Sequence, residues 1–259
     1  MKVEKRVPPF DRAHVQRVYG EHGEKFKSRL VRKVRTMNEG RLEGLGPQDQ
    51  AVYVANHQTS IDCFVPHLAI LSVGAPWPRS IATDKLNRWA YRTFMRWNFG
   101  FDLEDFGILW HPTKKTRENV LGYTESLAYS LSRGDSLLVF PQAKRCGRDV
   151  QVGEFEKGFY SALLEAQRVA DVPIKIECVA CDYDRIPEIG GPGKKSALLD
   201  CYSALRWHFV KGRGVARVNF GVPFDLLEAA GEGTRSQQAQ RVTRRSENYV
   251  RELLREARD

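Results

Sequence analysis

The chain has 259 residues, of which 42% are hydrophobic and 28% are charged, and its net charge is +9 at pH 7. This composition excludes an intrinsically disordered chain and is sufficient for one large α/β domain or two small ones. No segment approaches the roughly 18 apolar residues that a transmembrane helix needs, so any contact with a membrane is expected at its surface. The first residues lack the apolar segment of a signal peptide, and we expect a cytoplasmic protein.

The N-terminal part of the chain carries most of the positive charge. Residues 1–41 contain 12 Lys or Arg and 5 acidic residues, which gives a net charge of +7. Between residues 11 and 37 apolar residues recur at helical spacing, with basic residues on the other faces. We therefore predict a basic amphipathic helical arm over residues 1–46 that binds the anionic inner face of a membrane. A solvated helix without a partner is the alternative.

Beyond residue 47 the pattern alternates between strands and helices. Such alternation predicts a single α/β domain over residues 47–259, with a largely parallel central sheet flanked by helices. In chain order we expect a strand at 51–55, a helix at 61–71, a strand at 80–82, an aromatic helix at 86–97, a strand at 101–103, a helix at 116–132, a strand at 136–140, a helix at 155–169, strands at 173–180 and 215–220, and a helix at 236–257.

The five cysteines show no spacing that predicts a disulfide framework or a complete metal site. Cys178 and Cys181 form one C-x-x-C pair inside an apolar, strand-like run, and no second pair accompanies them. Buried, reduced thiols are therefore favoured over metal or redox chemistry. The high content of Lys and Arg raises a nucleic-acid binder as an alternative, but no Gly-rich phosphate loop, zinc-finger spacing or RNA-recognition motif supports it.

The most informative group of reactive residues follows the first strand expected after residue 47. Asn56 and His57 end that strand, and Asp62 lies five residues beyond His57. On a continuous helix this spacing places two side chains about 140° apart. They meet if His57 lies in a strand-to-helix loop and Asp62 in the first helical turn, with Thr59 or Ser60 as the N-cap. Asp62 then orients the imidazole and leaves one nitrogen as a base, whereas the alternative is a structural histidine.

Further short motifs follow along the chain. Asn56-His57-x4-Asp62 is followed by Phe-Pro-Gln-Ala-Lys-Arg at 140–145, by Phe155-x-x-Gly158 and by Val-Pro-Ile at 172–174. In this order, over about residues 50–180, they resemble the motif blocks of the glycerolipid acyltransferases, the family of lysophosphatidic acid and glycerol-3-phosphate acyltransferases.

The resemblance implies an enzyme of phospholipid biosynthesis. Such an enzyme moves a fatty acyl group from an acyl thioester, either acyl-coenzyme A or acyl carrier protein, to a hydroxyl of a lysophospholipid or a glycerol-phosphate-like acceptor. His57 would be the general base and Asp62 its orienting carboxylate, with no metal and no cofactor beyond the acyl donor. Cys63 and His67 are expected in the core. The alternatives are that Cys63 carries the acyl group covalently and that His67 is a metal ligand. The resemblance implies a substrate-binding set of Asn56, Lys85, Gly100, Gln142, Lys144 and Arg145.

Two motif blocks depart from the family pattern. The second block normally ends in an Arg, where this chain has Glu104 and Asp105, and the Glu of the third block is Gln142. An acidic pair repels a phosphate, so either Lys144 and Arg145 supply the positive charge or the acceptor lacks a phosphate. The alternatives are an acyltransferase of the same fold that acts on an amine, a sugar or a natural product, and a non-catalytic lipid-binding relative.

Acyl transfer from a thioester to an alcohol needs a base for the hydroxyl, a stabiliser for the oxyanion and the exclusion of water. A base takes the proton of the acceptor hydroxyl and later returns it to the thiolate, which we assign to His57. A stabiliser binds the oxyanion, and backbone N–H groups near the start of the helix after His57 are the candidates. Lys144 and Arg145 are the candidates for binding a phosphate of the acceptor or of the donor.

Overall fold

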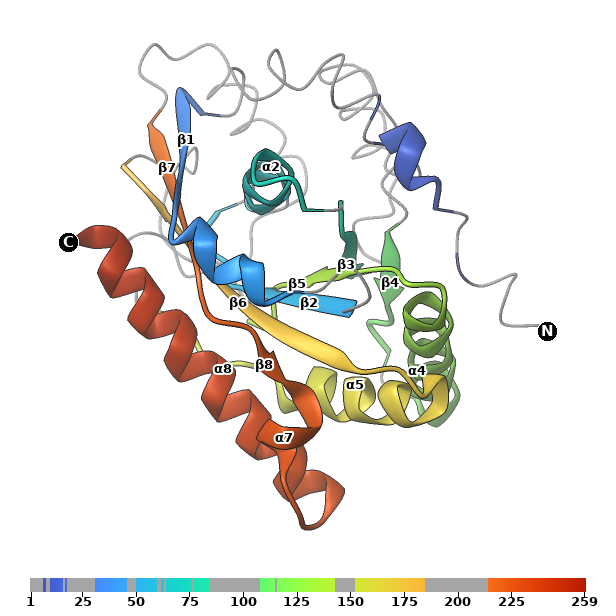
Figure 1. Ribbon diagram of the computed structural model, residues 1–259. Helices are drawn as coiled ribbons and strands as arrows, with labels where there is room; N and C mark the ends of the chain where they lie inside the picture. The colour runs from blue at the N-terminus through green and yellow to red at the C-terminus, as the bar shows by residue number, and fades with distance from the viewer. Residues whose placement is uncertain are drawn as a thin grey trace.

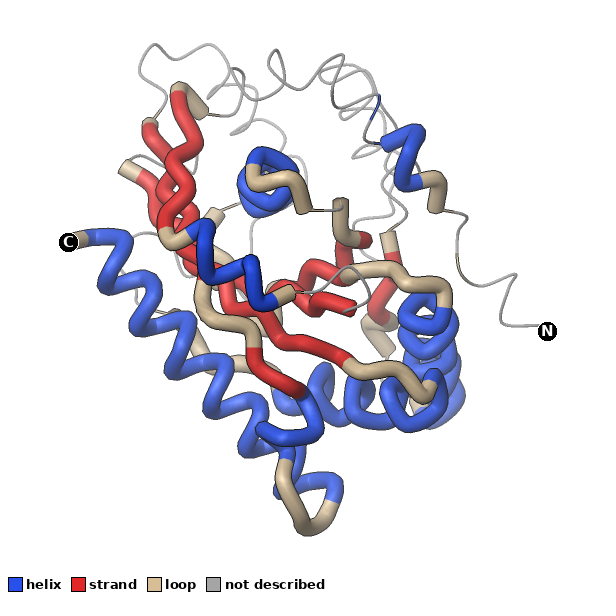
Figure 2. The backbone as a smooth tube through the Cα atoms, viewed as in Figure 1, coloured by secondary structure: helices blue, strands red, loops and turns tan. Residues whose placement is uncertain are grey.

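One mixed sheet organises the described part of the chain (Figures 1 and 2). The structure is a computed structural model and describes residues 7, 10–15, 17, 31–45, 50–59, 62, 64–75, 77–83, 108–114, 116–142, 152–184 and 214–259. The strands are β1 (Lys33–Met37), β2 (Gln50–Ala55), β3 (Arg79–Thr83), β4 (Leu109–His111), β5 (Leu137–Val139), β6 (Ile174–Tyr183), β7 (Val215–Phe220) and β8 (Phe224–Asp225). The helices are α2 (Val65–Ser72), α4 (Arg117–Ser132), α5 (Lys157–Ala170), α7 (Leu226–Ala230), α8 (Arg235–Arg258) and the 3-10 helix η2 (Glu39–Gly44).

The strands lie in the order β1-β7-β6-β2-β5-β3-β4, and β8 pairs with β6. Strand β2 is parallel to both of its neighbours, β5 and β6, and β3 is parallel to β5 and β4. Strand β7 is antiparallel to β6 and parallel to β1. The prediction of an α/β domain with a largely parallel central sheet is therefore confirmed.

Helices cover both faces of the sheet. Helix α2 lies on one face, and α4, α5 and α8 lie on the other (Figure 1). Successive side chains of a strand point to opposite faces, so Val52 and Val54 of β2 pack towards α5 while Tyr53 and Ala55 pack towards α2. A parallel strand covered on both faces is typically apolar throughout, and β2 is apolar and buried from Ala51 to Ala55.

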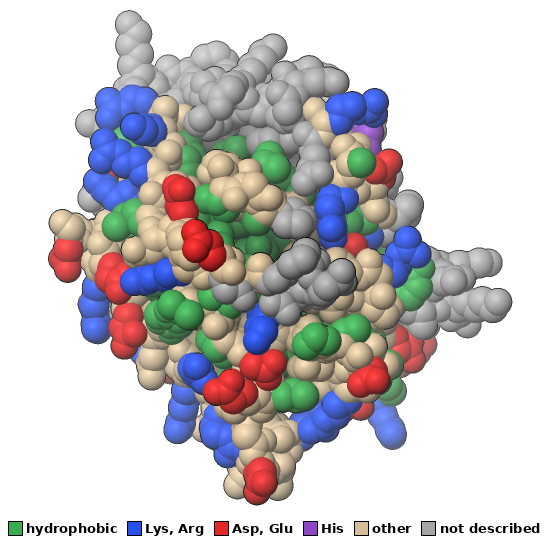
Figure 3. Space-filling model, in the orientation of Figure 1, with side chains coloured by type: hydrophobic (Ala, Val, Ile, Leu, Met, Phe, Trp, Pro, Cys, Tyr) green, Lys and Arg blue, Asp and Glu red, His purple; other side chains and the backbone are tan. Residues whose placement is uncertain are grey.

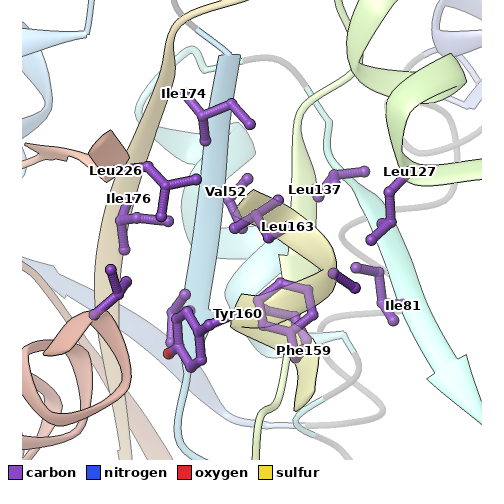
Figure 4. Packing of buried hydrophobic residues seen from close by; sticks show 14 of the residues in the cluster. Val52, Ile81, Leu127, Leu137, Phe159, Tyr160, Leu163, Ile174, Ile176 and Leu226 are labelled. Atoms are coloured by element: carbon purple, nitrogen blue, oxygen red, sulfur yellow. The ribbon is translucent and has the colours of Figure 1, made fainter. Parts of the chain in front are cut away.

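The larger hydrophobic core lies between the sheet and helix α5. Phe159, Tyr160 and Leu163 extend from α5 towards Val52 of β2 and Ile176 of β6 (Figure 4). Full burial of one such side chain contributes about 1.5–3 kcal/mol relative to its exposed state. This core fixes the central strands, whose ends carry the candidate site.

The N-terminal arm differs from its prediction. A helical turn is described at residues 12–15, but Lys33–Met37 is strand β1, so the expected helix is wrong over these residues. Lys33 and Arg35 are exposed while Val34 is half-buried, and this alternation has the period of a strand. Pairing with β7 also satisfies the backbone of the segment. The arm thus contributes a strand to the sheet, and whether its earlier residues form a separate arm stays a prediction.

The other expected elements are largely confirmed where the structure describes them. Strand β7 has the predicted bounds, and α2, α4, α5 and α8 begin and end within a few residues of theirs. Strands β4 and β8 and helix α7 were not predicted. The helix expected at 86–97 and the strand expected at 101–103 lie outside the described residues. Among the helices that the structure describes, none combines the length and apolar character needed to cross a membrane.

Candidate active site

The carboxyl ends of the three central strands meet at one edge of the sheet. Strand β2 lies between β5 and β6, and all three are parallel. The loop that carries His57 leaves β2 there, Gln142 follows β5, and Tyr183 ends β6. Open α/β sheets place their sites at this edge, because loops from neighbouring strands converge there.

His57 and Asp62 form a hydrogen-bonded pair in the loop after β2. Nδ1 of His57 lies 3.0 Å from Oδ2 of Asp62, and the side chains are 25% and 0% exposed, respectively. An ionised carboxylate accepts hydrogen bonds and cannot donate, so Nδ1 carries the proton in this pair. In the neutral imidazole, Nε2 is then the nitrogen without a proton. This is the arrangement that positions an imidazole for base catalysis.

Asp62 is held by its own loop as well as by His57. The backbone N–H groups of Gln58 and Thr59 donate to Oδ2 at 2.5 and 2.8 Å. A buried carboxylate needs such donors in place of water, and these two face inwards for that purpose. The sequence suggested that N–H groups in this region bind an oxyanion. These two N–H groups are not free to do so, because they already bind Asp62.

The local geometry around Asp62 also corrects the prediction for the following helix. Helix α2 begins at Val65, its N-cap Phe64 makes no side-chain cap bond, and Asp62 precedes the helix. Asp62 lies in a 3-10 turn before α2, where its N–H binds the carbonyl of Thr59 at 3.3 Å. The predicted side-chain cap by Thr59 is therefore wrong, and Ser60, the alternative cap, lies outside the described residues. The direction is reversed, because the side chain of Asp62 accepts the N–H of Thr59.

Tyr183 supplies a fourth donor to Asp62. Its hydroxyl lies 2.5 Å from Oδ1, and both side chains are buried. Burial, and then the charge of Asp62, raise the pKa of Tyr183 well above its usual value, so the hydroxyl keeps its proton and donates. Tyr183 was not predicted as a site residue, because it lies 121 positions from Asp62 and belongs to none of the motifs.

Residues of the third motif block, Phe140 and Gln142, contact His57 of the first block. Oε1 of Gln142 accepts the backbone N–H of His57 at 2.7 Å, and the rings of Phe140 and His57 lie 5.1 Å apart between centroids. Gln142 is 4% exposed, so this contact is made inside the protein. The structure thus shows Gln142 holding the backbone of the loop that carries His57, and its contact with substrate stays a prediction.

Asn56 also holds the loop. Its Nδ2 donates to the carbonyl of Cys181 at 2.8 Å, and its Oδ1 accepts the N–H of Cys181 at 2.6 Å. The side chain is 1% exposed, and these two bonds occupy both of its polar ends. The observed contacts therefore give Asn56 a part in anchoring the loop to β6, and its contact with substrate stays a prediction.

The remaining predicted residues divide into two groups. Lys85, Gly100, Lys144, Arg145 and Cys63 lie outside the described residues. His67 is buried in α2, where it stacks on Trp77 at 4.5 Å and its Nε2 lies 3.1 Å from the hydroxyl of Ser80, as expected of a core residue.

Cys178 and Cys181 are free, buried thiols, as predicted. They point to opposite faces of β6, one towards α8 and the other towards α2, so they cannot bind one metal ion together. Burial is the largest cause that raises the pKa of both thiols well above the usual value. In the part of the chain that the structure describes, no three His, Cys, Asp or Glu side chains are grouped as a metal site.

Comparisons with known proteins identify a family and a similar solved structure. A solved structure, the 1-acyl-sn-glycerophosphate (LPA) acyltransferase PlsC from Thermotoga maritima, is similar to this chain with 16% sequence identity and a TM-score of 0.49, over 92% of this chain and 79% of that one. No curated protein matches. The family described as Acyltransferase matches residues 28–177, which is more than half of the chain and includes His57, Asp62 and Gln142. The chain therefore belongs to the acyltransferase family.

Proposed function

We propose that the protein transfers a fatty acyl group from an acyl thioester to a hydroxyl of a lysophospholipid or a glycerol-phosphate-like acceptor. The observation that carries this proposal is the pair of His57 Nδ1 and Asp62 Oδ2 at 3.0 Å, in a chain of the acyltransferase family. The donor is acyl-coenzyme A or acyl carrier protein, since both present the acyl group as a thioester. The loop contacts described above support a preformed base at the end of β2.

The reaction follows from the orientation of His57. Nε2 takes the proton of the acceptor hydroxyl while its oxygen attacks the thioester carbonyl carbon. The tetrahedral adduct then collapses, the C–S bond breaks, and the imidazolium returns the proton to the thiolate. The products are an ester and a free thiol. Asp62 stabilises the imidazolium between the two proton transfers, since its Oδ2 faces Nδ1.

Release of free thiol from palmitoyl-coenzyme A tests this function. The wild type is offered lysophosphatidate, other lysophospholipids, glycerol 3-phosphate, and alcohols and amines without phosphate. We expect acceptor-dependent release that His57→Ala lowers by about 10²–10⁴-fold, because proton transfer by a positioned base contributes that factor. His14→Ala is the control, because His14 is also half-buried and lies in the N-terminal helical turn.

The outcomes separate the donor, the acceptor and the function itself. Release with a phosphate-free acceptor alone would assign the enzyme to the acyltransferases whose acceptor has no phosphate. That class is included in the test because Gln142 replaces the Glu of the family motif. If palmitoyl-coenzyme A gives no release, the same panel is repeated with palmitoyl acyl carrier protein. No transfer with either donor, or full activity of His57→Ala, would refute the proposal.

The basic N-terminal segment supports binding to an anionic membrane surface. Arg32, Lys33 and Arg35 are exposed at the start of β1, and basic side chains gather over β1 in Figure 3. Strand β1 is parallel to β7 and therefore antiparallel to β6, so its start lies at the sheet edge where β6 ends. His57 lies at the same edge. A membrane held by these residues would therefore face the edge at which the acceptor must enter.

A further inference from the structure

The last residues of β6 hold the catalytic loop on both sides of His57. The backbone of Cys181 binds Asn56, immediately before His57, at 2.8 and 2.6 Å. The hydroxyl of Tyr183 binds Asp62, five residues after His57, at 2.5 Å. Strand β6 is itself fixed, because it pairs with β2 on one side and with β7 and β8 on the other. The loop is thus tied to the centre of the sheet at two points.

The bond from Tyr183 differs from the other bonds of Asp62. The donors to Oδ2 are Nδ1 of His57 and the N–H groups of Gln58 and Thr59, which all belong to the same short loop as Asp62. They can shift together with it. Tyr183 binds the other oxygen, Oδ1, and comes from a distant strand. Among the hydrogen-bond partners of this carboxylate within the described residues, Tyr183 alone connects it to the sheet.

We propose that Tyr183 is a positioning residue of the active site, whose hydroxyl fixes the plane of the Asp62 carboxylate so that Oδ2 faces Nδ1 of His57 and keeps Nε2 free of a proton. This inference rests on the proposed acyl transfer for its kinetic consequence, but not for its structural one. Tyr183 lies beyond residues 28–177, so the match to the acyltransferase family does not include it.

Tyr183→Phe removes this bond and keeps the ring in place. The carboxylate loses the donor at Oδ1 and can turn about its Cβ–Cγ bond, so the bond to Nδ1 of His57 weakens and both imidazole tautomers become populated. We expect kcat to fall about 10- to 100-fold, the range for losing a hydrogen bond to a charged group. KM should change less than about twofold, since Tyr183 is buried and does not reach the substrate.

The experiment compares wild type, Tyr183→Phe and the control Tyr123→Phe. Tyr123 is also a buried tyrosine, on α4, and its hydroxyl has no hydrogen-bond partner in the described part of the chain. Each protein is labelled with ¹⁵N-histidine, and the spectrum of His57→Ala identifies the signals of His57. The ¹⁵N shifts report which ring nitrogen carries the proton, and thermal unfolding and steady-state kinetics are recorded on the same samples. A purely structural Tyr183 would lower the unfolding temperature and leave the tautomer unchanged.

A double variant tests whether Tyr183 acts through Asp62. If it does, Asp62→Asn/Tyr183→Phe has the same residual activity as Asp62→Asn, because the group that Tyr183 positions is already gone. This variant contains no buried carboxylate at position 62. It therefore serves as the test if Tyr183→Phe alone does not fold. A further loss of activity in the double variant would show that the two residues act independently and would overturn the proposal.

The tautomer decides the proposal in the single variant. Mixed tautomers of His57 in Tyr183→Phe, with the wild-type tautomer in Tyr123→Phe, support it, and an unchanged tautomer in Tyr183→Phe overturns it whatever the rate. The spectra need no substrate. If the wild type transfers no acyl group, the proposed function fails while the role of Tyr183 is still decided by the spectra.

Discussion

A carboxylate with no contact to water is stable in a protein only when hydrogen-bond donors replace the water. Asp62 has an exposed fraction of 0% and binds four donors, which are Nδ1 of His57, the N–H groups of Gln58 and Thr59, and the hydroxyl of Tyr183. Three of these four hydrogen bonds do not depend on the orientation of the imidazole of His57. The loop is therefore built around the carboxylate, and the imidazole is oriented by it.

Asp62→Asn tests this arrangement at the scale of one residue. The amide oxygen can still accept the N–H groups of Gln58 and Thr59, so the loop should keep its fold. It no longer stabilises an imidazolium, and we expect kcat to fall by about 10²–10⁴-fold. Asp171→Asn is the matched control, because Asp171 is exposed at the end of α5 with φ of 51°, a conformation that Asn also adopts. Near wild-type turnover of Asp62→Asn would exclude an orienting role.

At the scale of elements, the junction between β6 and β7 depends on close contact. The N–H of Gly221 lies 2.9 Å from the carbonyl of Cys178 and 2.9 Å from Oε1 of Glu177. A Cβ at this position would meet the ring of Tyr249 at 2.9 Å and the carbonyl of Cys178 at 3.2 Å. The ring is itself held, because the hydroxyl of Tyr249 binds the N–H of Val222 at 2.6 Å. Neither neighbour can move without breaking a hydrogen bond.

Two Gly→Ala variants measure the consequence. Gly221→Ala should lower the free energy of unfolding by about 1–3 kcal/mol, the usual cost of overpacking. Gly158→Ala is the control, since it lies in the first turn of α5 and its Cβ would have no heavy atom within 4 Å. Ala is the better helix former, so this variant should gain about 0.5–1 kcal/mol. Urea unfolding at pH 7 distinguishes the two, and equal stabilities would contradict the steric argument.

Elements defined by local pattern could be predicted from the sequence, and elements defined by distant pairing could not. The bounds of β7 were predicted because Val215–Phe220 has four apolar residues in six and glycine on either side. Strand β1 was taken as helix, because Val34 fits both a helical and an alternating pattern over so few residues. Its pairing with β7 depends on residues about 180 positions away.

The same distinction applies to the site. His57 and Asp62 were recognised because both belong to one loop, within five residues. The roles of Gln142 and Tyr183 depend on the order of β5, β2 and β6 in the sheet, which a single sequence does not contain.

At the scale of the whole molecule, charge distribution is the property to test. Some basic residues of the N-terminal segment lie in strand β1. Deletion of residues 1–41 would remove this strand, so a loss of membrane binding could not be distinguished from a loss of folding. Reversal of charge at exposed positions avoids this. Arg32, Lys33 and Arg35 can each be changed to Glu, because their side chains are exposed and β1 pairs with β7 through its backbone.

The triple charge reversal should weaken sedimentation with vesicles that contain anionic lipid. Each basic residue near such a surface contributes about 1 kcal/mol, so binding should fall by at least about tenfold and should depend on salt. The control changes Lys114, Arg117 and Arg244 to Glu, which alters the net charge equally at exposed positions elsewhere. Equal loss in both variants would indicate a general effect of net charge, and no loss in either would refute membrane binding through this segment.

The pairing of β6 also affects how often the loop that carries His57 separates from the sheet. Amides of a strand paired on both sides exchange with solvent mainly through openings that approach global unfolding, whereas loops usually open at little cost. Here the loop with His57 is bound to β6 through Cys181 and Tyr183, so it cannot detach without breaking its bonds to a strand that is paired on both sides. We therefore expect this loop to open about as rarely as a core strand, so that the imidazole of His57 keeps its orientation.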